Sequence, residues 1–172
     1  AGFALLINNL YGTKAFGDAG IDPVKYAFLG ALIGSAARII SGPIADRVGG
    51  GRMTVVATVG ISLASLYTCF QLSPTSADQF PQFLYGMLAI FFFAGVGNAA
   101  TFKQMPMIFP PRQAGGVIGW TGAIAAYGPF FFGIGLVGFG AVPFYWIGAV
   151  YAVACLAITW HRYARPGAIR KS

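Results

Sequence analysis

Residues 30–50 read GALIGSAARIISGPIADRVGG, a long apolar run that contains one arginine, Arg38, and ends at the charged pair Asp46-Arg47. A run of this kind is typical of a transmembrane helix, which needs about 20 mostly apolar residues. Arg38 lies eight residues before Asp46. At about 1.5 Å per residue this is ~12 Å inward, near the middle of a ~30 Å hydrocarbon core. Because arginine at the bilayer centre costs at least ~2.5 kcal/mol, we expect Arg38 to face the interior of a helix bundle.

The composition of the whole chain also indicates an integral membrane protein. Of its 172 residues, 57% are hydrophobic and only 9% are charged, whereas a soluble domain carries about 25% charged residues. Glycine supplies 25 residues, and glycine is unusually frequent in membrane helices, where it lets neighbouring helices approach closely. We therefore predict an all-α membrane protein.

The apolar stretches are long enough to form a bundle of membrane-spanning helices. The first, residues 1–12, has about half of the ~20 residues that a span needs, so we interpret it as the end of a helix whose beginning is missing. Five more stretches of about spanning length follow, over residues 24–45, 53–72, 80–102, 114–138 and 142–161. Prolines near the end of the third should terminate it, since proline removes a backbone donor: Pro106, Pro110 and Pro111.

Basic residues concentrate in alternate connections and in the C-terminal tail, at Arg47, Arg52, Lys103, Arg112, Arg162, Arg165, Arg170 and Lys171. The excess of 11 basic over 4 acidic residues would suggest nucleic-acid binding in a soluble protein, but this placement follows the positive-inside rule instead. We predict that these connections and the C-terminus face the cytoplasm. Six helices with both ends on one side are the pattern of half a twelve-helix transporter.

Arg38 has no acidic partner inside the apolar stretches, because the four aspartates lie in connections and the chain contains no glutamate. A guanidinium is planar, always charged and able to bind a planar oxyanion through two parallel N–H bonds. Two interpretations stay open: Arg38 binds an anionic ligand, or backbone carbonyls satisfy it. Small residues beside it favour close approach of another helix: Gly30, Gly34, Ser35, Ala36 and Ala37.

The segment after Arg38 resembles the G-x-x-x-D-R-x-G-x-[RK]-[RK] loop of the major facilitator superfamily, in the copy between helices eight and nine. It reads GPIADRVG over residues 42–49 and is followed by Arg52, with Gly51 at the place of the first basic residue of the closing pair. The resemblance implies a tight cytoplasmic turn in which Asp46 caps a helix or pairs with a neighbouring one. The gating residues that it implies here are Gly42, Asp46, Arg47, Gly49 and Arg52.

Two further stretches, AGVGNAATFKQMPMIF (94–109) and GGVIGWTGAIAAYGPFF (115–131), are similar to the glycine-rich tenth and eleventh helices of the nitrate/nitrite porter family. The opening AGFALL and the KYAFLG before Arg38 also fit this family. The resemblance extends over essentially the whole chain. It implies that residues 1–172 are the carboxyl-terminal six-helix half of such a porter, with the amino-terminal half as partner.

In that family a central arginine from each half grips nitrate or nitrite, and Arg38 matches the arginine of this half. Asn98 and Thr101 are three residues apart and share a helix face, where they could donate hydrogen bonds to an anion or to a neighbouring helix. The substrate-binding residues that we expect are Arg38, Asn98, Thr101, Gly119 and Gly122. Glycines expected to allow helix sliding during alternating access are Gly95, Gly97 and Gly128.

The sequence thus predicts a multi-pass carrier of nitrate or nitrite in a bacterial inner membrane, serving nitrate assimilation. We expect no enzyme activity, cofactor or metal, since the chain lacks paired carboxylates, a base near a nucleophile and clusters of metal ligands. Two alternatives stay open. The chain could carry another small anion, such as an organic carboxylate, or it could be a half that only packs against a partner or acts as a sensor. Anion exchange and proton symport also both remain possible.

Overall fold

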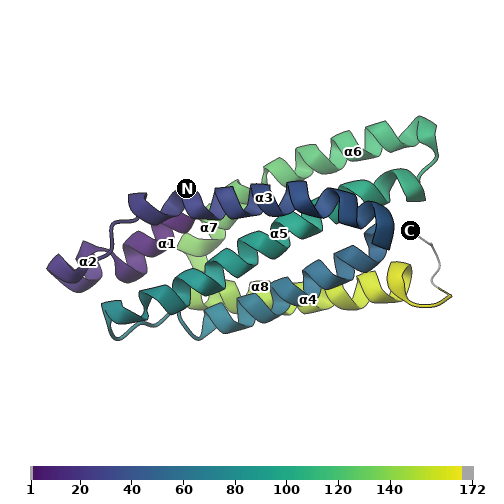
Figure 1. Cartoon of the computed structure of the whole chain (residues 1–172). Helices are drawn as coiled ribbons and strands as arrows, with labels where there is room; N and C mark the ends of the chain where they lie inside the picture. The colour runs from purple at the N-terminus through teal and green to yellow at the C-terminus, as the bar shows by residue number, and fades with distance from the viewer. Residues whose placement is uncertain (1, 168–172) are drawn as a thin grey trace.

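The computed structural model describes residues 2–167 of the chain, and regular structure in this part is helical throughout (Figure 1). The predicted tail residues Arg170 and Lys171 lie outside the described range. Short helical turns occur at Gly17–Ala19, Ala77–Gln79 and Trp160–Ala164. The α-helices are α1 (Gly2–Tyr11), α2 (Thr13–Phe16), α3 (Val24–Val48), α4 (Gly50–Cys69), α5 (Phe80–Ile108), α6 (Pro111–Ala126), α7 (Gly128–Phe139) and α8 (Ala141–Thr159).

Five stretches of the described chain are long and apolar enough to cross a membrane, which confirms the predicted all-α membrane class. They are Val24–Val48, Gly50–Cys69, Ala77–Ile108, Pro111–Phe139 and Ala141–Ala164. The fourth is divided between α6 and α7 at Tyr127, just before the Gly128-Pro129 pair. As expected for residues 1–12, α1 has only 10 residues and is too short to span a bilayer on its own.

One predicted boundary is wrong. Pro106 does not end its helix: α5 continues to Ile108, and the amide of Phe109 still donates to the carbonyl of Met105 at 3.1 Å. Proline removes one backbone bond but is tolerated inside helices of membrane proteins, where neighbouring helices support the chain. The later pair Pro110-Pro111 does mark a boundary, because α6 begins at Pro111.

Helix α5 is the centre of the bundle. It lies between α3 and α4, and α8 packs along α4 on the far side (Figure 1). Small residues set the α3–α5 contact: a Cβ on Gly95 would overlap the carbonyl oxygen of Gly34 and lie 3.0 Å from the Cβ of Ala37. The two helix backbones therefore touch, as small residues allow between membrane helices.

The buried core has two parts of different character. One is large and aromatic and joins α1, α4, α5, α7 and α8 through Phe3, Leu6, Ile7, Tyr11, Cys69, Leu72, Phe80, Phe83, Met87, Leu136 and Tyr145. The other joins α3, α4 and α5 through mostly small side chains: Ala37, Ala45, Met53, Ala57, Val96 and Ala100. Helices α3, α4 and α5 can therefore approach most closely on the stretch that includes Ala37, next to Arg38.

Most hydroxyl groups inside the bundle are satisfied within single helices or between neighbours, whereas the buried Nε2 of Gln104 has no hydrogen-bond partner among the described residues. Along α4 the hydroxyls of Thr54, Thr58, Ser62 and Thr68 each donate to the carbonyl four residues earlier, at 2.6–2.8 Å. The Tyr11 hydroxyl donates to the carbonyl of Gln71 at 3.2 Å. Such internal bonding is required in a membrane, because lipid offers no partner to an unpaired polar group.

The basic connections meet at one end of the bundle. The α3–α4 turn, the α5–α6 turn and the end of α8 lie there, opposite the ends that carry α2 and the α7–α8 turn (Figure 1). The described basic residues at this end are Arg47, Arg52, Lys103, Arg112, Arg162 and Arg165. The alternation of charge read from the sequence therefore corresponds to a cationic end in space.

The α3–α5 contact gives a stability prediction for Gly95→Val. The added side chain meets backbone at Gly34, which cannot move aside as a flexible side chain can, and overpacking of this kind costs about 1–3 kcal/mol. We expect a lower unfolding temperature in detergent, measured by intrinsic fluorescence. The matched control is Gly148→Val in α8, where a Cβ meets no atom within 4 Å. Equal unfolding temperatures for the two variants would contradict the proposed contact.

Candidate functional site

Arg38 lines a groove of about 280 Å³ between α3 and α5. The groove arises from helical periodicity, because residues three and four apart on each helix face the same side. Small residues make up most of its floor, so there is room for a ligand beside the guanidinium. Its lining residues are Gly30, Ala31, Gly34, Ser35, Arg38, Phe91, Ala94, Gly95 and Asn98.

The charge of Arg38 is not neutralised within the described part of the chain. Its side chain is exposed in the groove, and the ion pair found between described residues is a different one, Lys103 with Asp46. The contact made by the guanidinium is with an aromatic ring: its Cζ lies 5.7 Å from the ring centroid of Phe102 on α5. A cation held by a ring and open to a groove can accept an anionic partner.

The structure separates the two polar residues that sequence spacing placed together. Asn98 lines the groove beside Arg38 and is exposed there. Thr101 does not line it, and its hydroxyl donates to the carbonyl of Gly97 at 2.8 Å within the same helix. Asn98 is therefore available to a ligand in the groove, whereas the Thr101 proton is already used.

Ser35 and Phe102 are two neighbours of Arg38 that the sequence analysis did not assign to the site. Ser35 precedes Arg38 by one helical turn and lines the same groove with an exposed side chain. Its spacing of three from Arg38 was the available signal, since such pairs share a helix face. Phe102 belongs to the glycine-rich stretch that carries the family resemblance, but its contact with Arg38 depends on how α3 and α5 pack.

Gly119 and Gly122 do not join this groove in the described structure. Both lie on α6, and a Cβ on either would meet no atom within 4 Å. Helix α6 contacts the end of α5 but otherwise stands apart from the bundle (Figure 1). The two glycines are thus on an open helix, away from Arg38.

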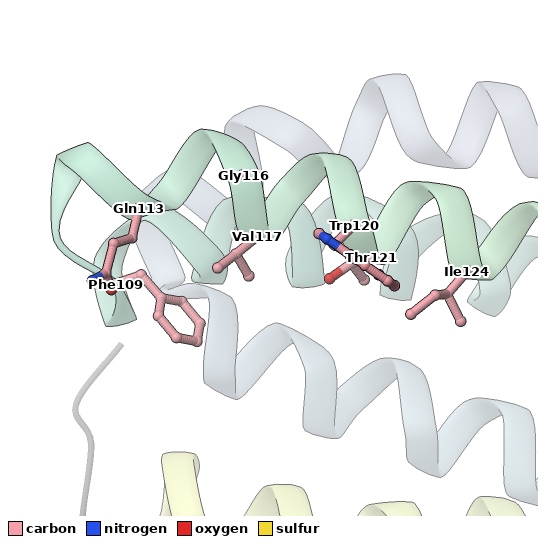
Figure 2. A pocket seen from close by; sticks show the side chains of 7 residues that line it. All are labelled: Phe109, Gln113, Gly116, Val117, Trp120, Thr121 and Ile124. Carbon is pink, nitrogen blue, oxygen red and sulfur yellow. The ribbon is translucent and has the colours of Figure 1, made fainter.

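Helix α6 instead carries a shallow hollow of its own, about 450 Å³ in volume. Figure 2 shows the side chains that line it along one side of the helix, with Phe109 at its beginning. Most are apolar, and Trp120 is 72% exposed. The lining residues are Phe109, Gln113, Gly116, Val117, Trp120, Thr121 and Ile124.

The residues of the superfamily-like loop connect three helices at the cationic end. Asp46 near the end of α3 pairs with Lys103 on α5. Gly49 turns the chain from α3 into α4 with φ +96, a conformation that favours glycine, and its amide donates to Ala45 at 3.0 Å. Arg47 and Arg52 are exposed on either side of this turn.

The glycines assigned to gating occupy different environments. Gly95 touches the α3 backbone, and a Cβ on Gly97 would lie 3.3 Å from the Cβ of Ala57 on α4. Gly42 and Gly128 have open space at the Cβ position. Only the first two therefore lie where a side chain would obstruct the movement of one helix against another.

The described residues contain no group of three or more His, Cys, Asp or Glu side chains that could hold a metal ion. Cys69 is buried and Cys155 is half-buried, and both are free thiols. The chemistry at Arg38 is therefore that of one cation, an amide and a hydroxyl, suited to binding an anion.

The chain is similar to proteins named as nitrate/nitrite transporters. It is 54% identical over 172 residues to the "Probable nitrate/nitrite antiporter NarK2" of Thermus thermophilus, an alignment that covers 96% of this chain and 38% of the relative. It is 28% identical over 191 residues to the nitrate/nitrite transporter NarU of Escherichia coli (strain K12), covering 96% of this chain and 40% of the relative. NarU of Salmonella typhimurium is 29% identical over the same length and with the same coverage.

The chain spans about two fifths of the length of these relatives. A search of protein-family models gives no match. The named relatives support the resemblance to the nitrate/nitrite porter family that the motifs of α3 and α5 indicate.

Proposed function

We propose that this chain belongs to the nitrate/nitrite porter family and is the carboxyl-terminal six-helix half of a transporter of the major facilitator superfamily. In this proposal Arg38 binds the transported anion. The observation that carries it is an arginine in a membrane-length helix, lining a groove and without a carboxylate partner among the described residues. Similarity to a protein named as a nitrate/nitrite antiporter supports the identity of the anion.

The chemistry of the groove suits a small planar oxyanion. Two N–H groups of a guanidinium match two oxygens of such an ion, and these charge-assisted bonds are stronger than neutral ones. Asn98 and Ser35 line the same groove and supply an amide and a hydroxyl donor, either for the third oxygen of nitrate or for the free lone pairs of an ion with two oxygens. Nitrate and nitrite both fit this donor set. A small carboxylate would also fit and is the alternative that the experiment below separates.

An amino-terminal half is the partner that this architecture calls for. The groove is open to the outside of the chain, and few residues of the span Pro111–Phe139 are buried. Its large side chains include Trp120 at 72%, Tyr127 at 62% and Phe131 at 64% exposure. A second half that covers the groove would enclose the anion and contribute a second cation to it.

The proposed mechanism is alternating access, with the anion near the bilayer midplane and the two halves rocking about it. Binding of the anion neutralises Arg38, which lowers the cost of enclosing the site between the halves. The cationic end of the bundle faces the cytoplasm under the positive-inside rule. In this proposal the C-terminus lies on the cytoplasmic side of a bacterial inner membrane, and the carrier serves nitrate assimilation.

Replacement of Arg38 by lysine tests the anion contact. Arg38→Lys keeps the charge but loses the two parallel N–H bonds, so we expect nitrate and nitrite uptake to fall about tenfold or more. Uptake is measured in proteoliposomes with the protein that contains both halves, at equal amounts of folded protein. Arg112→Lys, at an exposed position in the first turn of α6, is the matched control and should transport normally.

Three outcomes would contradict the proposal in different ways. Unchanged uptake by Arg38→Lys would remove the anion role of this residue. If Arg38→Lys yields less folded protein but the same uptake per folded molecule, Arg38 contributes to packing and not to anion binding. Uptake of a small carboxylate in place of nitrate by the unmodified protein would keep the anion site but change its substrate.

The Asp46–Lys103 ion pair gives a second prediction. The side chains are 50% and 44% exposed, and such exposed pairs contribute only about 0–1 kcal/mol to stability. We therefore expect Asp46→Asn and Lys103→Gln to leave the unfolding temperature nearly unchanged. Each change should alter the transport rate, because it removes an ion pair between α3 and α5 that forms in one state of the transport cycle.

A double-mutant cycle checks whether the two residues act together. If the pair is the cause, Asp46→Asn with Lys103→Gln should alter the rate no more than either change alone. Additive effects of the two changes would show that the residues act independently.

A further inference from the structure

We propose that Phe102 is a positioning residue for Arg38, whose ring holds the guanidinium at the groove without contacting the anion itself. This inference rests on the proposed anion-binding role of Arg38. It adds to that role a residue on a different helix, so that the geometry of the site depends on α3 and α5 together.

The geometry places the ring next to the guanidinium but outside the groove. The Cζ of Arg38 is 5.7 Å from the Phe102 ring centroid, within the range of about 6 Å for a cation–π contact. Phe102 follows Asn98 by four residues and therefore lies one turn along the same face of α5. Arg38 and Asn98 both line the groove, whereas Phe102 does not. In this proposal the ring therefore acts on the anion through Arg38.

The type of partner matters for an arginine that must bind and release an anion. A carboxylate would neutralise the guanidinium and occupy the N–H groups that the anion needs. An aromatic face attracts the cation through its quadrupole and leaves the charge in place. The N–H donors lie in the guanidinium plane, and a single ring near Cζ does not occupy them as the two oxygens of a carboxylate would.

The surroundings leave few other side chains to restrain Arg38. Three of the residues that flank it in the groove are small: Gly34, Ala94 and Gly95. A long side chain beside such residues has many rotamers to choose from, and its ordering by a bound anion is costly. A ring that orders Arg38 beforehand reduces this cost, so that its loss weakens binding rather than the later steps of transport.

The experiment compares Phe102→Leu, which removes the ring, with Phe102→Tyr, which keeps it. In proteoliposomes with the protein that contains both halves, we expect Phe102→Leu to raise the apparent KM for nitrate about two- to fivefold with an unchanged maximal rate. Phe102→Tyr should transport like the unmodified protein. If Phe102→Leu does not fold, Phe102→Met, which is also apolar and without a ring, takes its place.

The matched control is Phe93→Leu. Phe93 is another half-buried phenylalanine of α5, but its ring packs on α4 at Gly60 and away from Arg38. A KM increase in Phe93→Leu as large as in Phe102→Leu would overturn the proposal, because it would show a general response to the loss of a ring. An unchanged KM in Phe102→Leu, or an equal increase in Phe102→Tyr, would overturn it as well.

A spectroscopic measurement tests the contact without relying on transport. The side-chain N–H resonance of Arg38, assigned by its disappearance in Arg38→Lys, should carry a ring-current shift from Phe102. We expect this shift to vanish in Phe102→Leu and persist in Phe93→Leu. A resonance that does not move in Phe102→Leu would overturn the contact, whereas unmodified protein that transports neither nitrate nor nitrite would overturn the proposed function separately.

Discussion

A guanidinium in the apolar middle of a helix must be stabilised without a neighbouring carboxylate, and the site depends on how the bundle meets this constraint. Arg38 is bordered by residues small enough to leave a groove, and its described contact is the ring of Phe102 at 5.7 Å. An arginine at this depth without compensation is costly. The same arrangement that lowers this cost leaves the cation free, so stability and ligand binding place opposite demands on one side chain.

Close packing of α3 on α5 makes the arrangement possible. Gly95 lies against the carbonyl of Gly34, which brings α5 near enough for its Phe102 ring to reach Arg38. The bundle therefore has two cores: a small-residue core between α3, α4 and α5, and an aromatic core around Phe83. One part permits close approach of helices, and the other fixes α1, α7 and α8 with large interlocking side chains.

The sequence predicted those features that depend on composition and local chemistry. Five spans, the short α1 and the alternation of basic connections follow from hydropathy and charge, and the DRVG stretch indicated the turn at Gly49. Features that depend on neighbouring helices were not predictable. Thr101 bonds to its own backbone although its spacing from Asn98 suggested a shared role. Gly119 and Gly122 lie on α6, whose distance from α3 no local pattern encodes.

Proline within α5 has a mechanical consequence for this bundle. Pro106 lacks an N–H, so it cannot donate to the carbonyl of Phe102, and its ring crowds that carbonyl. The helix is consequently easier to bend at this turn than along its uninterrupted length. Phe102 and Lys103 lie at this compliant joint, one in contact with Arg38 and the other paired with Asp46. Flexing of a single turn of α5 would therefore strain the arginine contact and the ion pair at the cationic end of the bundle at the same time.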